Sequence, residues 1–225
     1  DPDRAPRRIN RWGYIKEEIH GADARLVGLM TQSEEDSIEE AEANLQKQAH
    51  GDHPFKIIRA TVNGEQAQST VTSIEAPRDY NFHQLQTVLD LAERESPEVK
   101  PRTIHLPPGT RPGFLAALAD TMHTSARSIP YVYHGRIYEL RRTSARTIPN
   151  LRLAHTSYGR ATAADFTVTS TYDGEQFGFS MTYGTEGRYA EVPLTASYRP
   201  RWWMEINLTL DDEDAGPTLT DGVDR

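Results

Sequence analysis

Residues 202–210, WWMEINLTL, decide the fold class of this 225-residue chain. From Met204 onward apolar residues stand at the even positions and polar residues at the odd ones. Side chains on a β-strand point alternately to opposite faces, so the pattern predicts a strand with one apolar face and one wet face. The side chains that we expect to be buried are Met204, Ile206, Leu208 and Leu210. Those that we expect to be much more exposed are Glu205, Asn207 and Thr209.

The same alternation runs backward from this stretch. It recurs over residues 191–199, with Arg199-Pro200 where a turn would fall, and over residues 177–183 after an Asp173-Gly174 turn signal. It appears once more over residues 165–169. Residues 165–210 are therefore predicted to form a four-stranded antiparallel meander.

The chain before the meander mixes strands and helices. Strands are expected at residues 9–19 and 25–31, followed by a thinly amphipathic helix that begins at Ser33. A hairpin is expected from residues 55–62 to 66–74 through Asn63-Gly64. Pro77 should end its second strand.

Two better-packed helices are expected further on. Asn81 is predicted to cap the first of them and Thr110 the second. The predicted buried stripe of the second consists of Phe114, Leu115, Leu118, Ala119 and Met122. Pro-rich residues 96–109 should form the extended connection between the two helices.

A second hairpin is predicted at His134-Gly135, and residues 151–153 are expected to begin the next strand. Together these elements predict an α+β fold: a mainly antiparallel, rolled or barrel-like sheet of eight or more strands, with about three inserted helices. The expected organisation is an N-terminal arm (1–8), one β-rich domain (9–210) with a candidate internal boundary near 96–109, and an acidic tail (211–225).

Composition excludes some classes of partner. The formal net charge is -8, whereas general nucleic-acid binders need surplus cations to neutralise phosphates, so we expect no nucleic acid among the partners. No apolar run approaches the roughly 18 residues of a membrane-spanning helix, so membrane association would be peripheral and through a partner. The chain has no Cys and begins Asp1-Pro2-Asp3, and from this we expect a processed bacterial protein in an extracytoplasmic compartment, periplasmic or secreted.

No sequence motif indicates a particular reaction. Nucleophile elbows, phosphate loops and His-Glu-x-x-His spacings are missing from the sequence, so we predict no catalytic residue and no cofactor. His50 and His53 flank Gly51-Asp52 but lack known metal-ligand spacing, and the acidic run from Asp211 lacks the ligand order of a calcium loop. We therefore predict no metal site.

Trp203 is the most informative single residue. It falls on the wet face of its strand between Arg201 and Glu205, while Trp202 falls on the apolar face. Exposed Trp and Arg are enriched at protein interfaces, although an inserted helix covering Trp203 would explain the same pattern. With the acidic residues Asp211 and Asp212 that follow, the predicted protein-contact residues are Trp203, Arg201, Glu205, Asp211 and Asp212.

Three functions follow from these features. The first is a non-enzymatic accessory or structural subunit of a larger extracytoplasmic assembly, which acts through contacts with other protein subunits. The second is a calycin-like module whose rolled sheet encloses an apolar ligand against an aromatic inner face. That face would consist of Phe166, Phe177, Phe179, Tyr183 and Tyr198. The third is a hydrolase with an unrecognised site, for which a cleft that holds a His and a carboxylate within hydrogen-bond reach would argue.

Overall fold

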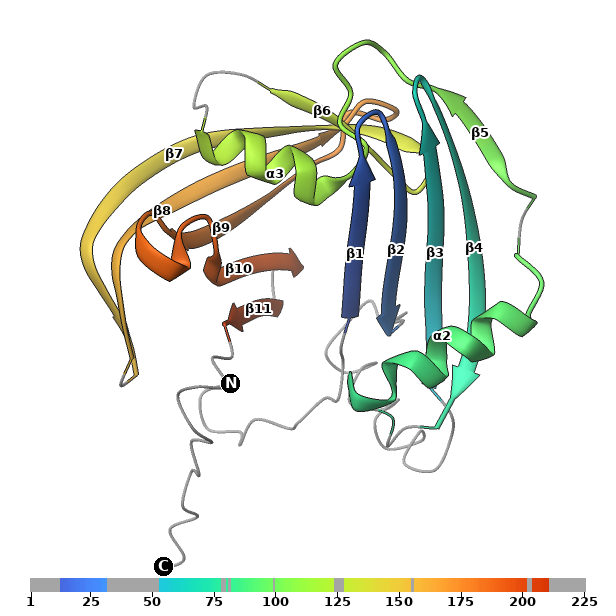
Figure 1. The fold of residues 1–225 in the computed structure, drawn as a ribbon, viewed down its shortest axis with the longest axis horizontal. Coiled ribbons are helices and arrows are strands. Elements are labelled where there is room, and N and C mark those ends of the chain that lie inside the picture. The colour runs from blue at the N-terminus through green and yellow to red at the C-terminus, as the bar shows by residue number, and fades with distance from the viewer. Residues whose placement is uncertain are drawn as a thin grey trace, which may run out of the picture. The chain divides into compact units, whose positions relative to one another are not determined.

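The computed structural model describes residues 13–31, 53–77, 80, 82–98, 100–123, 128–154, 156–201 and 204–210. The predicted arm at 1–8, the tail at 211–225 and the helix from Ser33 lie outside these ranges. The chain divides into two compact units, one comprising residues 1–116 and 130–137 and the other residues 117–129 and 138–225. Each unit is described by itself (Figure 1).

The first unit contains a five-stranded antiparallel sheet in the order β1-β2-β3-β4-β5. Its strands are β1 (Gly13–His20), β2 (Asp23–Thr31), β3 (His53–Asn63), β4 (Gln66–Ala76) and β5 (Arg102–His105). The predicted hairpin at Asn63-Gly64 is confirmed, with Gly64 at a φ of 56° that favours glycine. Residues 96–109 are not wholly an extended connection, because β5 pairs within them with Gln66–Ser69 of β4.

Helix α2 (Leu85–Arg94), preceded by the 3-10 turn Phe82–Gln84, covers one face of this sheet. Its buried residues Val88 and Ala92 pack on a core from three strands. The strand residues of that core are Leu29, Phe55, Ile57, Ile74 and Ala76. On the opposite face the tip of the hairpin formed by β6 (Ile129–Tyr133) and β7 (Arg136–Leu153) contributes Val132 to a second cluster with Leu26 and Val62.

Helix α3 (Phe114–His123) begins at a carboxylate from β1. The backbone N–H groups of Leu115 and Ala116 donate to Oε1 and Oε2 of Glu17 over 2.9 and 3.1 Å. A helix leaves its first N–H groups without intrahelical acceptors, so Glu17 satisfies this end. Thr110 was predicted as the cap, but its hydroxyl donates to the carbonyl of Pro107 instead.

The burial of α3 also differs from the predicted stripe. The helix buries Ala117, Leu118 and Thr121, while Leu115 is 39% exposed and Ala119 is exposed. The spacing of apolar residues correctly predicted that a helix forms here. Its rotation is set by what packs against it, which the spacing alone does not contain.

The second sheet has six strands in the order β11-β10-β9-β8-β7-β6. After β7 come β8 (Thr156–Ser170), β9 (Gln176–Gly184), β10 (Pro193–Arg201) and β11 (Met204–Thr209). The predicted meander over 165–210 is therefore confirmed as antiparallel. Figure 1 shows the long curved strands β7 and β8 of this sheet. Residues 151–153 end β7 rather than begin a new strand, and Arg199-Pro200 lies inside β10, since β10 continues to Arg201.

The strands do not form one rolled or barrel-like sheet. In the described part of the chain they belong to two open sheets, each with two terminal strands. The predicted mainly antiparallel character is confirmed, because every described strand pairing is antiparallel. A calycin-like closed interior is not what these residues build.

Candidate functional site

The second sheet has an apolar face that the register of its strands defines. Phe166 pairs with Phe179, Phe179 with Tyr198, and Tyr198 with Ile206, so one row of large side chains crosses four strands. The rings of Phe166 and Phe179 stack at 4.8 Å between centroids, and those of Phe177 and Tyr198 meet edge-on at 5.8 Å. The aromatics predicted to share a face do share one, but it is a face of an open sheet.

Only part of this face is covered. Phe166 and Val168 on β8 are 2% and 0% exposed, whereas Phe177 on β9 is 39% exposed. The predicted burial fails at Ile206 and Leu208, which are 39% and 62% exposed, whereas Leu210 after β11 is half-buried and the side chain of Met204 lies outside the described residues. Ile206 and Leu208 occupy the apolar positions of the strand, but the burial does not alternate, because Asn207 and Thr209 are exposed as well. We call Phe177, Tyr198, Ile206 and Leu208 the apolar patch.

The predicted contact residues follow Tyr198 in the sequence and lie on either side of Ile206 and Leu208. Arg201 is the last residue of β10 and Glu205 is the second residue of β11. Trp203, Asp211 and Asp212 lie outside the described residues. The role of all five in a protein contact stays a prediction.

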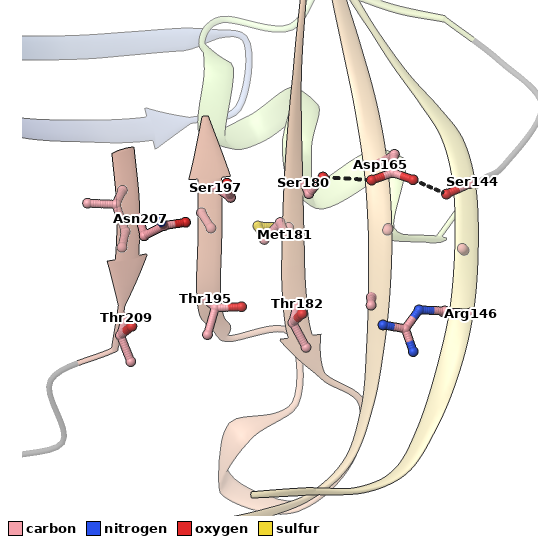
Figure 2. Close-up of a pocket in the computed structure, with 15 residues that line it drawn as sticks. Ser144, Arg146, Asp165, Ser180, Met181, Thr182, Thr195, Ser197, Asn207 and Thr209 are labelled. Atoms are coloured by element: carbon pink, nitrogen blue, oxygen red, sulfur yellow. Dashed lines mark hydrogen bonds between the residues drawn. The ribbon is translucent and has the colours of Figure 1, made fainter. Parts of the chain in front are cut away.

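The opposite face of the same strands carries small polar side chains around a hollow of about 590 Å³ (Figure 2). Asp165 on β8 accepts hydrogen bonds from Ser144 on β7 over 2.5 Å and from Ser180 on β9 over 2.7 Å. These two hydroxyls, with a smaller contribution from Arg146, hold the pKa of Asp165 below its ordinary value. Antiparallel sheets commonly present one such face to water, and this one offers no aromatic side chain on which a ligand could stack.

Another hollow of the second unit, about 370 Å³, lies beside the last turn of α3. Arg142 on β7 donates from Nη1 to the carbonyl oxygen of Met122 and to the hydroxyl of Tyr183, each over 2.8 Å. At the rim, Nε2 of His123 lies 3.2 Å from Oε1 of Glu191, with each side chain about 60% exposed. A guanidinium that binds one of the last carbonyls of a helix is an ordinary capping contact.

The pair His123–Glu191 is the His and carboxylate arrangement that would favour a hydrolase. It supplies a base and an orienting acid, but within the described residues His123 makes no hydrogen bond to a hydroxyl that could serve as nucleophile. Both members are also well solvated. The described residues thus provide a base and an acid but no nucleophile beside them.

Metal ligands do not gather in the described part of the chain: no group of three or more His, Asp or Glu side chains there could hold an ion. His53 opens β3, while His50 and Asp52 lie outside the described ranges. The absence of a metal therefore stays a prediction.

Sequence reasoning missed both side-chain clusters of the second unit. His123 and Glu191 are distant in the sequence and on unrelated elements, so no spacing could have joined them. The contact of Asp165 with Ser180 could have been found, because the Asp173-Gly174 turn fixes the register of the β8–β9 hairpin. The exposure of Ile206 and Leu208 depends on which other residues pack against them, and alternation carries no signal for that.

Comparisons with known proteins found no relative of this chain. No family model matches it, and no curated protein and no solved structure is similar to it. Among the described helices, none combines the length and the apolar character needed to cross a membrane.

Proposed function

We propose that this protein is a non-enzymatic accessory subunit of a larger extracytoplasmic assembly in a bacterium, and that it contacts another protein through the apolar patch. The observation that carries the proposal is the exposure of Leu208 and Ile206, at 62% and 39%, on the same face as Phe177 and Tyr198. Isolated exposed apolar residues are ordinary, but a contiguous group across neighbouring strands marks an interaction surface.

The chemistry of the patch suits a protein partner. Aromatic side chains are enriched at the centres of interfaces, where they bury a large area at a low entropic cost. Burial already raises the pKa of Tyr198, with Glu175 adding to the effect, so its hydroxyl stays neutral at an interface near neutral pH. Burying the remaining surface of Phe177, Ile206 and Leu208 would contribute about 25 cal/mol per Å² removed from water.

An apolar small ligand is the alternative occupant of this face. It has less support, because small-ligand sites are concave and enclose most of the ligand surface, while the patch lies on an open sheet. The hydrolase alternative rests on His123 and Glu191 alone. Location outside the cytoplasm is compatible with a chain that has no Cys, and fractionation of the source cells tests it.

The test is a pair of matched substitutions in the full chain, expressed in the organism that makes it. Leu208→Lys places a charge in the apolar patch, while Tyr172→Lys places the same charge at a 73% exposed residue of the β8–β9 turn. We expect a stoichiometric partner, seen by native mass spectrometry, to be lost with Leu208→Lys and retained with Tyr172→Lys. Because both side chains are exposed, both variants should keep the wild-type melting temperature.

Two results would contradict the proposal. One is a partner that remains bound to Leu208→Lys at wild-type stoichiometry. The other is a wild-type chain that is monomeric in its native extract and carries an apolar small molecule that Leu208→Lys releases.

A further inference from the structure

The free edges of the two sheets are not alike. A terminal strand exposes unpaired backbone groups, and proteins usually guard such strands with charge, with Pro or by keeping them short. In the first sheet, β1 carries Lys16 and Glu18, paired over 2.5 Å, and β5 has only four residues, with Arg102 and His105 at its ends. In the second sheet, β6 contains Pro130 in five residues.

The remaining terminal strand, β11, has Glu205 and a register shift against β10 near its start, and its less protected part is residues 206–209. This segment has no charged residue, no Pro and no register irregularity against β10. Among the described residues no strand pairs with its outer side. An unguarded apolar edge promotes aggregation, and pairing with another strand removes that tendency.

The hydrogen-bonding direction along β11 follows from one contact. The backbone N–H of Leu210 donates to the carbonyl of Leu194 on β10 over 2.8 Å. In an antiparallel ladder, successive residues direct their backbone groups to opposite sides, so Leu208 and Ile206 also bond toward β10. Asn207 and Thr209 therefore present their N–H and C=O groups outward, ready to accept another strand.

An added strand would also have to continue both faces of the sheet. On one face the row Phe166, Phe179, Tyr198, Ile206 is apolar, and on the other the row Asp165, Ser180, Ser197, Asn207 is polar, as Figure 2 shows for its labelled members. Neighbours across a sheet pack against side chains of their own kind. The matching segment therefore alternates apolar residues with Ser or Thr.

The charge of the residues after β11 suggests which kind of residue should precede that segment. The acidic residues Asp211, Asp212, Glu213 and Asp214 follow β11 directly in the sequence. Every described strand pairing in the molecule is antiparallel, and an antiparallel neighbour brings its N-terminal end beside the C-terminal end of β11. A basic residue before the segment would complement the charge of these acidic residues.

We propose that β11 accepts an extended segment of the partner protein as a seventh strand, antiparallel to β11, with alternating apolar and hydroxyl residues and a basic N-terminal flank. Peptide recognition by strand addition works in this way, since main-chain hydrogen bonds supply affinity and alternate side chains supply specificity. The inference rests on the proposed function and adds the mode of recognition.

The probe is a short synthetic peptide in which Val and Thr alternate after two N-terminal Lys residues. It is titrated against the full chain and against Asn207→Pro and Asn207→Ala. Proline at position 207 removes the outward N–H and leaves the hydrogen bonds to β10 intact, and edge strands tolerate proline at such a position. Alanine keeps the outward N–H. We expect wild type and Asn207→Ala to bind alike and Asn207→Pro to bind at least about tenfold more weakly, with melting temperatures confirming that each variant is folded.

The peptide itself supplies further controls. A scrambled peptide of the same composition should bind weakly, and so should one with its Lys residues moved to the C-terminus. Strand addition is overturned if the alternating peptide does not bind the wild-type chain, or if Asn207→Pro binds it as well as Asn207→Ala does. If the native partner is lost with Leu208→Lys but retained with Asn207→Pro, the apolar patch is the contact surface and the edge is not, so this inference fails while the proposed function stands.

Discussion

Glu17 and Gly113 depend on each other at the start of α3. A Cβ atom at residue 113 would lie closer than 3.0 Å to the carboxylate carbon and both carboxylate oxygens of Glu17. Glycine at this position thus leaves space for the group that accepts the N–H groups of Leu115 and Ala116. Because the displaced atoms are the far end of a flexible side chain, an added methyl group would evict the cap rather than break the backbone.

A double-mutant cycle tests this dependence. We expect Glu17→Ala to lower the free energy of unfolding by about 1–2 kcal/mol, as loss of a helix cap does, and Gly113→Ala to cost about the same. The double variant should cost no more than Glu17→Ala alone, because there is then no carboxylate to displace. Urea unfolding of the four proteins gives the coupling energy, and strictly additive costs would show that Gly113 does not act through Glu17.

The ionisation of Glu17 gives a pH dependence of known sign. Burial raises its pKa above the ordinary value of 4.5, against the opposing effect of the backbone N–H groups of Leu115, Ala116 and Phe114. A carboxyl with a raised folded-state pKa contributes stability that is complete below 4.5 and is lost as pH rises through the folded-state value.

The comparison variant is Glu17→Gln, which cannot ionise. We expect the unfolding free energy of the wild type, relative to Glu17→Gln, to fall as pH rises from below 4.5 toward neutrality. Chemical denaturation across this range provides the measurement. Parallel profiles for the two proteins would mean that Glu17 titrates in the folded state as it does in the unfolded chain.

At the scale of a strand, burial changes sharply between neighbouring positions on one face of the second sheet. Leu194 on β10 is 0% exposed, whereas Leu208 on β11 is 62% exposed. Truncation to alanine at a buried Leu costs about 2–5 kcal/mol, while truncation of an exposed one usually costs less than about 0.5 kcal/mol.

The pair Leu194→Ala and Leu208→Ala should therefore separate clearly in thermal or urea unfolding of the isolated chain. Ile206→Asp should likewise cost little more than an ordinary surface change, in contrast with the several kcal/mol that the sequence pattern predicts for a buried position. A large loss of stability for either β11 variant would show that this strand is covered by the chain's own residues.

Asp165 joins three neighbouring strands through two hydroxyl groups. The hydrogen bonds from Ser144 and Ser180 lower its pKa from the ordinary value of 3.8, so it contributes stability above 3.8 that is lost as pH falls through the folded-state value. We expect Ser144→Ala with Ser180→Ala to return the pKa of Asp165 toward its ordinary value, as measured by carboxyl NMR. No change in that pKa would mean that these bonds do not form in solution.

Alternation in the sequence predicted the strands of the meander and the side chains that share a face. It could not predict which of those side chains are covered, since Val168 and Ile206 follow the same rule and differ in what packs over them. The caps show the same limit, because Thr110 was a reasonable local candidate and the acceptor came from β1, far away in the sequence. Local patterns determine the directions of side chains, while distant neighbours determine their burial.

For the whole molecule, the sequence predicted mainly antiparallel pairing but not the division of strands into two open sheets. The strands on either side of this division, β5 and β6, are separated by α3, so no hairpin signal links them. Open sheets have terminal strands, and among the described ones β11 is the least protected over residues 206–209 and carries the most exposed apolar strand residue, Leu208. That coincidence supports a subunit whose second sheet is completed by another protein.

Site-specific photocrosslinking in the source organism tests this claim most directly. A photoreactive amino acid replaces Leu208 in the apolar patch in one strain and Tyr172 in the β8–β9 turn in another, since both side chains are exposed. The account predicts one discrete adduct with another protein from position 208 and no such adduct from position 172. Absence of a protein adduct at 208, or the same set of adducts from both positions, would contradict it.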